Sequence, residues 1–279
     1  MKRFKKIGLY LLGFIVVSFL LMKITGTTVN DIGLKILSGV KWITGNSVNL
    51  EDIENSEKPV VDHSNWTELL KDYVTIEGVV NYKGFEADHF KLDEYLKLLS
   101  DNAPGINWSA NDEKAFWINA YNAFTVKLIL DHYPVNSIKD ISEGMTMISS
   151  SWDLKFFTIG GVEFDLNTIE HEILRTKFPD YKVHFAVNCA SKSCPRLRNE
   201  AYVGNRLSEQ LENQAKYFIN NSFKNKITSS STQISSIFSW FSSDFTSEQT
   251  LVSILEKYHS EFNPNNSMEY LPYDWTLNE

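Results

Sequence analysis

The sequence predicts an α+β fold, rich in helices and with a small antiparallel sheet. Three observations favour this class: helical patterns dominate the chain, one Gly-Gly pair separates two short strand-like runs, and no long alternation of strands and helices indicates a parallel sheet. Of the 279 residues, 43% are hydrophobic and 13% aromatic, so the chain can bury a substantial core. This composition excludes a mostly disordered protein, a collagen and a disulfide-dense mini-protein.

A central helix is predicted between Ser109 and Pro134. The run AFWINAYNAFTVKLIL is apolar on nearly every side, so we expect this helix to lie in the middle of the fold. The Ser109 hydroxyl and Asp112 resemble a capping box at its start, and Pro134 predicts its end near His132.

The other elements follow from shorter patterns. Residues 154–166 read LKFFTIGGVEFDL, which is typical of a β-hairpin whose two glycines supply the positive φ angles of a tight turn. The segment 228–243 has eight serines among sixteen residues, but three aromatic residues within it favour an ordered connector. A short buried strand is predicted at 183–187, and further helices at 92–99, 168–177, 206–220 and 247–259.

The first 25 residues predict a signal anchor. Residues 7–22 form an uncharged apolar run that would span about 24 Å as a helix. Four basic residues before it orient the amino terminus toward the cytoplasm. We therefore expect a single-pass protein of the cell membrane, in contact with the bilayer through residues 7–24 and with its bulk extracytoplasmic. A cleaved signal peptide is the alternative, although residues 20–23 offer no small-x-small cleavage site.

The remainder is interpreted as a membrane-proximal stalk at 26–65 and a single globular domain at 66–279. The formal net charge is −8, and residues 1–23 hold five positive and no negative side chains, so residues 24–279 carry −13. An acidic body repels phosphate backbones, so we expect no nucleic-acid partner. Nucleotide, flavin and zinc-protease motifs are absent from the sequence, which indicates no cofactor and no metal.

The strongest chemical signal is HFAVNCASKSCPRLR, residues 184–198. The predicted strand ends just before Cys189, which begins a loop of small and polar residues, a frequent place for catalytic side chains. An imidazolium raises the ionised fraction of a nearby thiol, and His171 and His184 are the histidines nearby in sequence. A reactive thiolate at Cys189 is therefore one interpretation.

Besides an interpretation of both cysteines as ordinary buried side chains, two other interpretations of this segment remain open. Cys189 and Cys194 lie five positions apart in a chain that is predicted to be exported, so a small-loop disulfide is one of them. A metal site formed by His184, Cys189 and Cys194 is the weaker one, because no second pair of ligands follows at zinc-site spacing.

A second polar group lies in DLNTIEHEILR, residues 165–175. Asn167 is predicted to cap the helix, which puts Glu170 where its carboxylate can bond the backbone N–H of the cap. A helical-wheel count also places Glu170 near the centre of the apolar face and His171 at its edge. A buried carboxylate needs a partner, which we expect to be Arg175, Arg196 or a histidine. His171 is the candidate general base.

Asn119 and Asn122 lie three positions apart on the central helix and must find hydrogen bonds inside the fold. They are secondary candidates for orienting a catalytic group or stabilising an oxyanion, but holding a neighbouring loop is the more frequent use of such side chains. Near the carboxyl end, Tyr273, Asp274 and Trp275 indicate a packed terminus.

Five motifs occur in a recognisable order between residues 79 and 278. They are EKAFWINAYNAFTVKLIL, IGGVEFDLNTIEHEILR, HFAVNCASKSCPRLR, SIFSWFSSDF and YLPYDWTLN. Together they resemble the domain-of-unknown-function family numbered 547. The resemblance implies that Cys189 and the Glu170–His171 pair are regular features, whereas the position of Cys194 is serine in some members. It therefore favours Cys189 as the functional cysteine and counts against an obligatory disulfide.

A papain- or transglutaminase-like arrangement is one way to assemble such groups, by analogy. Those enzymes place the cysteine before the histidine, whereas His171 precedes Cys189, so a permuted order is required. We therefore expect a thiol hydrolase or acyl-transfer enzyme acting on peptide or amide bonds. Cys189 is its nucleophile, His171 its base with His184 in reserve, and Glu170 its orienting carboxylate.

The alternative is a non-catalytic envelope interaction module. In it, Cys189 and Cys194 form a structural disulfide and the acidic surface binds a protein partner.

Overall fold

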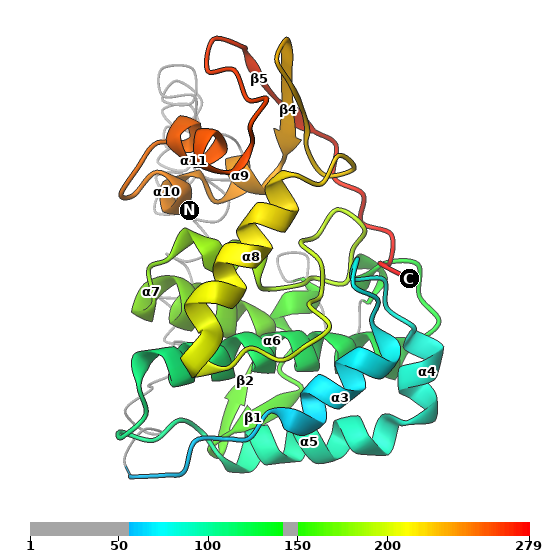
Figure 1. Ribbon diagram of the computed structural model, residues 1–279. Coiled ribbons are helices and arrows are strands. Elements are labelled where there is room, and N and C mark those ends of the chain that lie inside the picture. Colours follow the sequence, from blue (N-terminus) through cyan, green and yellow to red (C-terminus); the bar gives the residue numbers. More distant parts are fainter. Residues whose placement is uncertain (1–55, 142–149) are drawn as a thin grey trace, which may run out of the picture.

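The computed structural model describes residues 56–141 and 150–279. Helices outnumber strands in these ranges, so the predicted α+β class is confirmed (Figure 1). The predicted anchor at residues 7–24 and most of the predicted stalk lie outside the described residues. None of the helices within the described ranges is both long enough and apolar enough to span a membrane.

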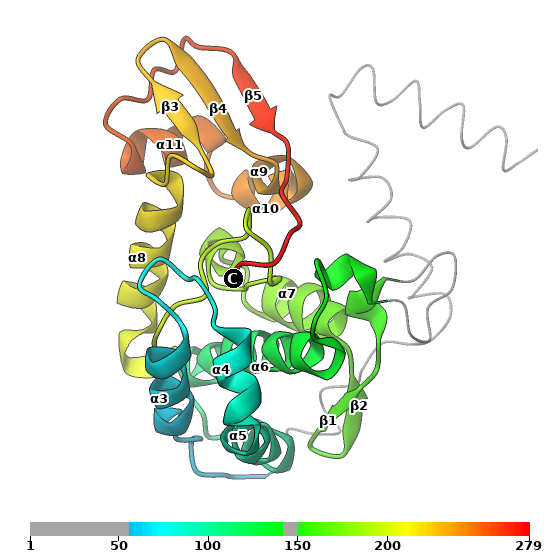
Figure 2. The same ribbon diagram turned by 90° about the vertical axis from the view of Figure 1, so that its right-hand side faces the viewer.

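The larger hydrophobic core is built around helix α6, Ala110–His132. Nearly every side of α6 is buried, as its apolar pattern predicts, and the Ser109 hydroxyl accepts a hydrogen bond of 3.1 Å from the Asp112 backbone N–H. Around it lie α3 (Ser64–Tyr73), α4 (Tyr82–Ala87), α5 (His89–Asp101) and a hairpin of β1 (Phe157–Ile159) and β2 (Val162–Phe164) (Figures 1 and 2).

The hairpin turn is the one that the sequence predicts. Phe157 pairs with Phe164, and Gly160 and Gly161 form the turn with φ angles of +61° and +81°. Residues that carry a side chain rarely adopt such φ angles, so the two glycines fix the position of the turn.

A second, smaller core lies at the other end of the molecule, and helix α8 (Leu207–Ile219) connects the two cores (Figures 1 and 2). Its elements are β3 (Lys226–Thr228), β4 (Ser231–Ser235), α9 (Ile237–Trp240), α10 (Ser242–Phe245), α11 (Leu251–Tyr258) and β5 (Met268–Leu271). Strand β4 pairs antiparallel with β3 but parallel with β5. The prediction of antiparallel pairing alone is therefore corrected, because the connection through three helices returns β5 in the direction of β4.

The buried strand predicted at 183–187 is wrong. Residues Tyr181–Phe185 form a 3₁₀ helix, η5, whose start is capped when the Asp180 carboxylate accepts a hydrogen bond from the Lys182 N–H at 3.0 Å. Residues 183–187 are buried as expected. A short apolar run reports burial but does not distinguish a strand from a short helix.

The helix predicted at 168–177 exists, but its geometry differs. It consists of a π-helical stretch, η4 (Thr168–Leu174), followed by α7 (Arg175–Lys177). Asn167 is not its cap, because its backbone is already helical; the Asp165 carboxylate instead accepts a hydrogen bond of 2.7 Å from the Thr168 N–H. Short 3₁₀ turns complete the fold: η2 (Ile138–Asp140), η3 (Ser151–Asp153) and η6 (Gly204–Arg206).

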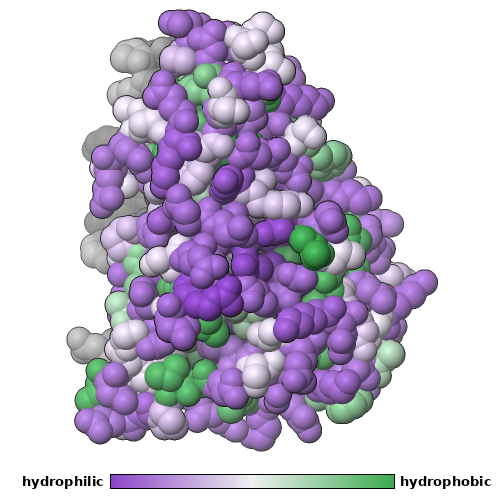
Figure 3. Space-filling view, viewed as in Figure 1, coloured by the Kyte–Doolittle hydropathy of each residue, from purple (hydrophilic) through white to green (hydrophobic). Residues whose placement is uncertain are grey.

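The surface seen in the space-filling view is mostly hydrophilic, with small separate hydrophobic patches (Figure 3). This distribution is typical of a domain that faces water.

Candidate functional site

Cys189 lies on a loop that helix α6 holds in place. The Asn122 side chain donates to the Ala186 carbonyl and accepts from the Asn188 N–H, both at 2.9 Å. Ala190, directly after Cys189, has a φ of +58°, in the left-handed region that costs an L-residue about 1–2 kcal/mol. Its N–H donates to the Asn188 side-chain oxygen at 2.9 Å. The loop is therefore a fixed, locally strained turn, as is common next to functional groups.

Asn119 holds a different loop. Its amide donates to the Tyr202 carbonyl at 2.8 Å and accepts from the Tyr202 N–H at 2.9 Å. The two asparagines of α6 thus position backbone segments, which is the more frequent of the uses expected for them.

The C-terminal segment closes the other side of the cysteine loop. After β5 the chain runs back toward α4 (Figure 1). The N–H groups of Lys192 and Ser193 on the cysteine loop donate to the carbonyls of Thr276 and Asp274 in this segment, at 2.8 and 3.1 Å. The backbone N–H groups of residues 190, 192, 193 and 194 all have partners inside the protein. They are therefore not available as the oxyanion-binding donors expected after Cys189.

The two cysteines meet at this turn as free thiols. Their Sγ atoms lie 2.6 Å apart, and the Cys189 N–H donates to the Cys194 sulfur at 2.8 Å. The hydroxyls of Ser191 and Tyr273 each lie 3.4 Å from the Cys189 sulfur. Cys194 is only 3% exposed, whereas Cys189 is partly exposed. The contacts of the Cys189 sulfur are thus one thiol and two hydroxyl groups.

The negative charge of this pair belongs on Cys194. Burial alone would raise the pKa of its thiol. Hydrogen bonds from the Cys189 thiol and N–H and from Tyr273, together with the charge of Lys224, outweigh burial and lower the pKa of Cys194 to about 7. Burial and the adjacent Cys194 raise the pKa of Cys189 well above that of an ordinary thiol. The surroundings of the pair thus favour the thiolate form of Cys194 over that of Cys189.

Both candidate histidines belong to a separate cluster around Arg175 and Asp244. The Arg175 guanidinium lies 2.7 Å from His171 Nδ1 and donates two hydrogen bonds, of 2.5 and 2.9 Å, to the Asp244 carboxylate. His184 Nε2 lies 2.7 Å from the same carboxylate. The structure therefore brings the imidazoles to an ion pair, and neither imidazole is among the partners of the Cys189 sulfur.

His184 is packed as a core side chain. Its ring stacks on Phe241 with centroids 4.0 Å apart, and its Nδ1 is buried without a hydrogen-bond partner. Burial lowers the pKa of His184, although Asp244 opposes this shift.

Glu170 is buried, as the helical wheel predicts, with 7% of its surface exposed. Its charge acts on Tyr121 of α6, a residue that the sequence reasoning missed, and on Arg175, one of its expected partners. Burial, the charge of Glu170 and the charges of both cysteines raise the pKa of Tyr121 well above its usual range. Tyr121 thus connects the Glu170 carboxylate with the surroundings of the thiol pair.

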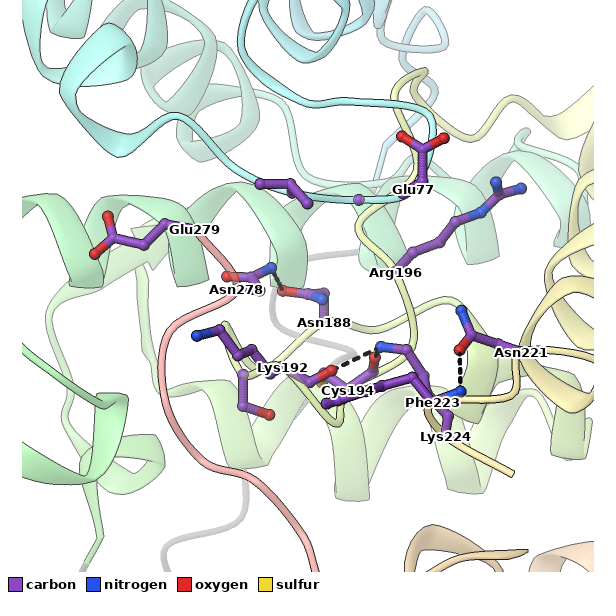
Figure 4. Close-up of a pocket in the computed structure, with 13 residues that line it drawn as sticks. Glu77, Asn188, Lys192, Cys194, Arg196, Asn221, Phe223, Lys224, Asn278 and Glu279 are labelled. Carbon is purple, nitrogen blue, oxygen red and sulfur yellow. Dashed lines mark hydrogen bonds between the residues drawn. The ribbon is translucent and has the colours of Figure 1, made fainter. Parts of the chain in front are cut away.

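A cavity of about 260 Å³ opens beside Cys194 (Figure 4). The Lys224 ammonium in its wall donates to the carbonyl of Lys192 at 2.9 Å and to that of Cys194, and it is thereby held against the cysteine loop. The other lining residues are Glu77, Gly78, Val79, Asn188, Ser191, Arg196, Asn221, Phe223, Asn278 and Glu279.

Lys224, Asp244 and Tyr121 had no distinctive pattern in the sequence. Asp244 and Tyr121 lie within two of the five motifs, which was the only available signal, and Lys224 lies outside all of them.

The metal site weighed for His184, Cys189 and Cys194 is not assembled, because His184 binds Asp244 while the sulfurs bind each other. Across residues 56–141 and 150–279, no group of three or more His, Cys, Asp or Glu side chains is arranged to hold a metal ion.

Comparison with known proteins finds one family. The family described as "Protein of unknown function, DUF547" matches residues 106–219, the range that contains α6, the hairpin, η4 and the cysteine loop. No curated protein and no solved structure matches the chain.

Proposed function

We propose that the site in residues 106–219, the range that matches the model of the DUF547 family, is that of a cysteine-dependent hydrolase or acyl-transfer enzyme acting on peptide or amide bonds. One observation carries the proposal. A partly exposed thiol, Cys189, lies 2.6 Å from the sulfur of Cys194, the cysteine with the lower pKa and a residue of the cavity lining.

Cys189 is the nucleophile in this proposal because it is the more exposed sulfur. Its S–H proton passes to the Cys194 thiolate while its sulfur attacks the carbonyl carbon of the substrate. The C–N bond then breaks, the leaving amine takes the proton from Cys194, and a thioester remains on Cys189. Water attacks this thioester and gives a proton to the Cys194 thiolate, which returns it to Cys189 as the acid product leaves.

The hydroxyls of Tyr273 and Ser191 are the proposed donors to the oxyanion, since the backbone N–H groups of residues 190, 192, 193 and 194 are engaged elsewhere. Burial raises the pKa of Tyr273 well above its usual range, so its hydroxyl keeps its proton and can donate. A donor of this kind stabilises the charge that develops on the substrate oxygen.

In this proposal a thiolate takes the place that the papain- or transglutaminase-like analogy gives to an imidazole. His171 and Glu170 then have positioning roles. His171 contacts Arg175 of the ion pair with Asp244, and the charge of Glu170 acts on Tyr121.

The test is the release of p-nitrophenol from p-nitrophenyl acetate by Cys189→Ser, Cys194→Ser and His171→Ala. We expect a burst of product as the thioester forms. Cys189→Ser should abolish the burst, Cys194→Ser should slow it by about 10²–10⁴ and move its pH midpoint upward, and His171→Ala should leave that midpoint unchanged. A burst that survives in Cys189→Ser, or a midpoint that moves in His171→Ala, would refute the mechanism.

The same sulfur contact favours a second candidate function. A small rearrangement would join Cys189 and Cys194 in a disulfide, as in the non-catalytic envelope module considered above. The discriminating measurement is the intact mass of the protein from an oxidising compartment. A mass that rises by two hydrogens on reduction supports the module, whereas an unchanged mass supports the enzyme.

We also propose that the chain is anchored in the cell membrane through residues 7–24, with residues 66–279 extracytoplasmic. The support is the apolar run with its basic flank in the sequence. Fractionation of cells tests this. The full chain should remain with membranes after an alkaline wash, and a chain without residues 1–25 should not; equal release of both would contradict the proposal.

A further inference from the structure

The cavity beside Cys194 contains a cation that no carboxylate of the described residues neutralises. We propose that this cation, the Lys224 ammonium, binds a carboxylate group of the substrate, which makes acidic acyl groups or peptides the substrate class. The inference rests on the proposed function and deepens it.

The geometry of Lys224 leaves one of its N–H groups for a ligand. Its ammonium donates to the carbonyls of Lys192 and Cys194, so two of its three N–H groups are fixed and the third remains for a ligand. The figure of the cavity shows this contact beside the cysteine loop (Figure 4). An ammonium held in this way is an oriented point charge, and such charges are suited to bind anions.

The charged groups that act on Lys224 are thiols and not carboxylates. Burial lowers its pKa, and the groups whose charges oppose this shift are the two cysteines, with no carboxylate among them. Glu77 and Glu279 line the cavity but lie on its side away from Lys224 (Figure 4). The Glu279 carboxylate accepts the Tyr133 hydroxyl at 2.9 Å.

The lining holds two other cations: Lys192, whose side chain is exposed, and Arg196, which is already occupied. Its guanidinium donates to Gln214, to the Ile76 carbonyl and to Asn213, at 2.8 to 2.9 Å. It also stacks on the ring of Tyr217 at 3.7 Å. Lys224 is therefore the cation of this cavity that is placed to meet a ligand close to the sulfurs.

The negative charge next to Lys224 changes during the proposed reaction. In the proposed mechanism, a Cys194 thiolate balances the charge of Lys224 at rest. When Cys194 takes the proton of Cys189 this anion disappears, and a substrate carboxylate supplies its replacement. Binding of the carboxylate therefore favours the protonated form of Cys194 that the attack produces. The exposed apolar side chains of Val79 and Phe223, 47% and 60% exposed, stand at the same cavity and would contact an apolar neighbour of that carboxylate.

Two alkylating reagents that differ only in charge test the inference. Iodoacetate carries a carboxylate and iodoacetamide does not, and both react with the same thiolate, so the ratio of their rates does not depend on the thiolate fraction. We expect this ratio at the alkylated cysteine, identified by peptide mapping, to exceed that of glutathione. Lys224→Met should lower the ratio about tenfold, which corresponds to about 1.4 kcal/mol, and Lys224→Arg should restore most of it.

The matched control is Lys226→Met. Lys226 is an exposed lysine two positions away on β3, outside the cavity lining, so its loss removes the same charge without touching the cavity. Its ratio should equal that of the unchanged protein. An equal fall in Lys224→Met and Lys226→Met, or no fall in either, overturns the inference. Neither result affects the proposed function, which fails separately if Cys189→Ser keeps the burst.

A second arm identifies the source of the carboxylate. N-acetylalanine offers a terminal carboxylate, and N-acetylglutamate α-amide offers an acidic side chain. N-acetylglutamine α-amide, the neutral counterpart of N-acetylglutamate α-amide, offers no carboxylate. Protection against iodoacetamide by N-acetylalanine alone indicates a peptide terminus, and protection by N-acetylglutamate α-amide alone indicates an acidic side chain. Protection by neither acid, or by the neutral amide equally, overturns the inference.

Discussion

The assignment of the negative charge to Cys194 predicts how its titration responds to changes at Cys189. In the structure, the Cys189 thiol is the first of the donors that stabilise the Cys194 thiolate. We compare two variants that each leave Cys194 as the single cysteine: Cys189→Ala, which removes this donor, and Cys189→Ser, which replaces it with a hydroxyl. Both keep the backbone N–H that donates to the Cys194 sulfur at 2.8 Å.

The size of the effect follows from the hydrogen bond that is lost. With a pKa of about 7, about half of Cys194 is thiolate at pH 7. A hydrogen bond to a charged acceptor contributes about 1.5–3 kcal/mol, which corresponds to a pKa change of about 1–2. Cys189→Ala should therefore titrate Cys194 near pH 8–9 and leave about 1–10% thiolate at pH 7. Cys189→Ser should stay within about half a unit of pH 7, because a hydroxyl donates at least as well as a thiol.

The assay is the ultraviolet absorbance of the thiolate as a function of pH, with circular dichroism as the check that both variants stay folded. The unchanged protein should show one step near pH 7 and a second one far above it, since the two thiols share their protons. The reasoning is refuted if the Ala and Ser variants titrate at the same pH, because the thiol of Cys189 then contributes nothing to the charge on Cys194.

Three predictions concern stability. Burial lowers the pKa of His63 to about 4, below the unfolded value near 6.5, so the unfolded chain binds a proton that the folded one does not. Stability should fall by about 3 kcal/mol between pH 6.5 and 4, and His63→Gln should remove this dependence in urea unfolding; an unchanged dependence would exclude His63 as its source. Asp244→Asn removes the carboxylate that pairs with the half-buried Arg175 guanidinium and should lower the free energy of unfolding by about 3 kcal/mol. Asp101→Asn, in an exposed ion pair, should lower it by less than about 1 kcal/mol. Equal unfolding midpoints for the two variants would contradict this prediction. A Cβ on Gly78 (φ +87°) would lie 2.5 Å from an arginine side chain, whereas one on Gly161 (φ +81°) meets nothing within 4 Å, so Gly78→Ala should lower the thermal midpoint more.

Local patterns accounted for much of the fold. Helix α6 was predictable because apolar residues on every side of a capped 23-residue segment can be buried only in the centre of a domain. The hairpin was predictable because two adjacent glycines permit its turn. The cap of η4 was not, since Asn167 and Asp165 are both good capping residues and only the path of the chain selects between them.

The candidate site divides in the same way. The sequence by itself determined that Cys189 lies on a loop directly after a buried segment and that Glu170 points into the core, because burial follows from the residues nearby in the chain. Only the tertiary structure decided which groups meet the sulfur. Tyr273 reaches Cys189 from 84 positions away, and the Asp244 carboxylate holds both His184 and Arg175 in a separate cluster. The physical reason is that a periodic pattern specifies which face of an element is buried, whereas the partner on that face depends on how distant elements pack.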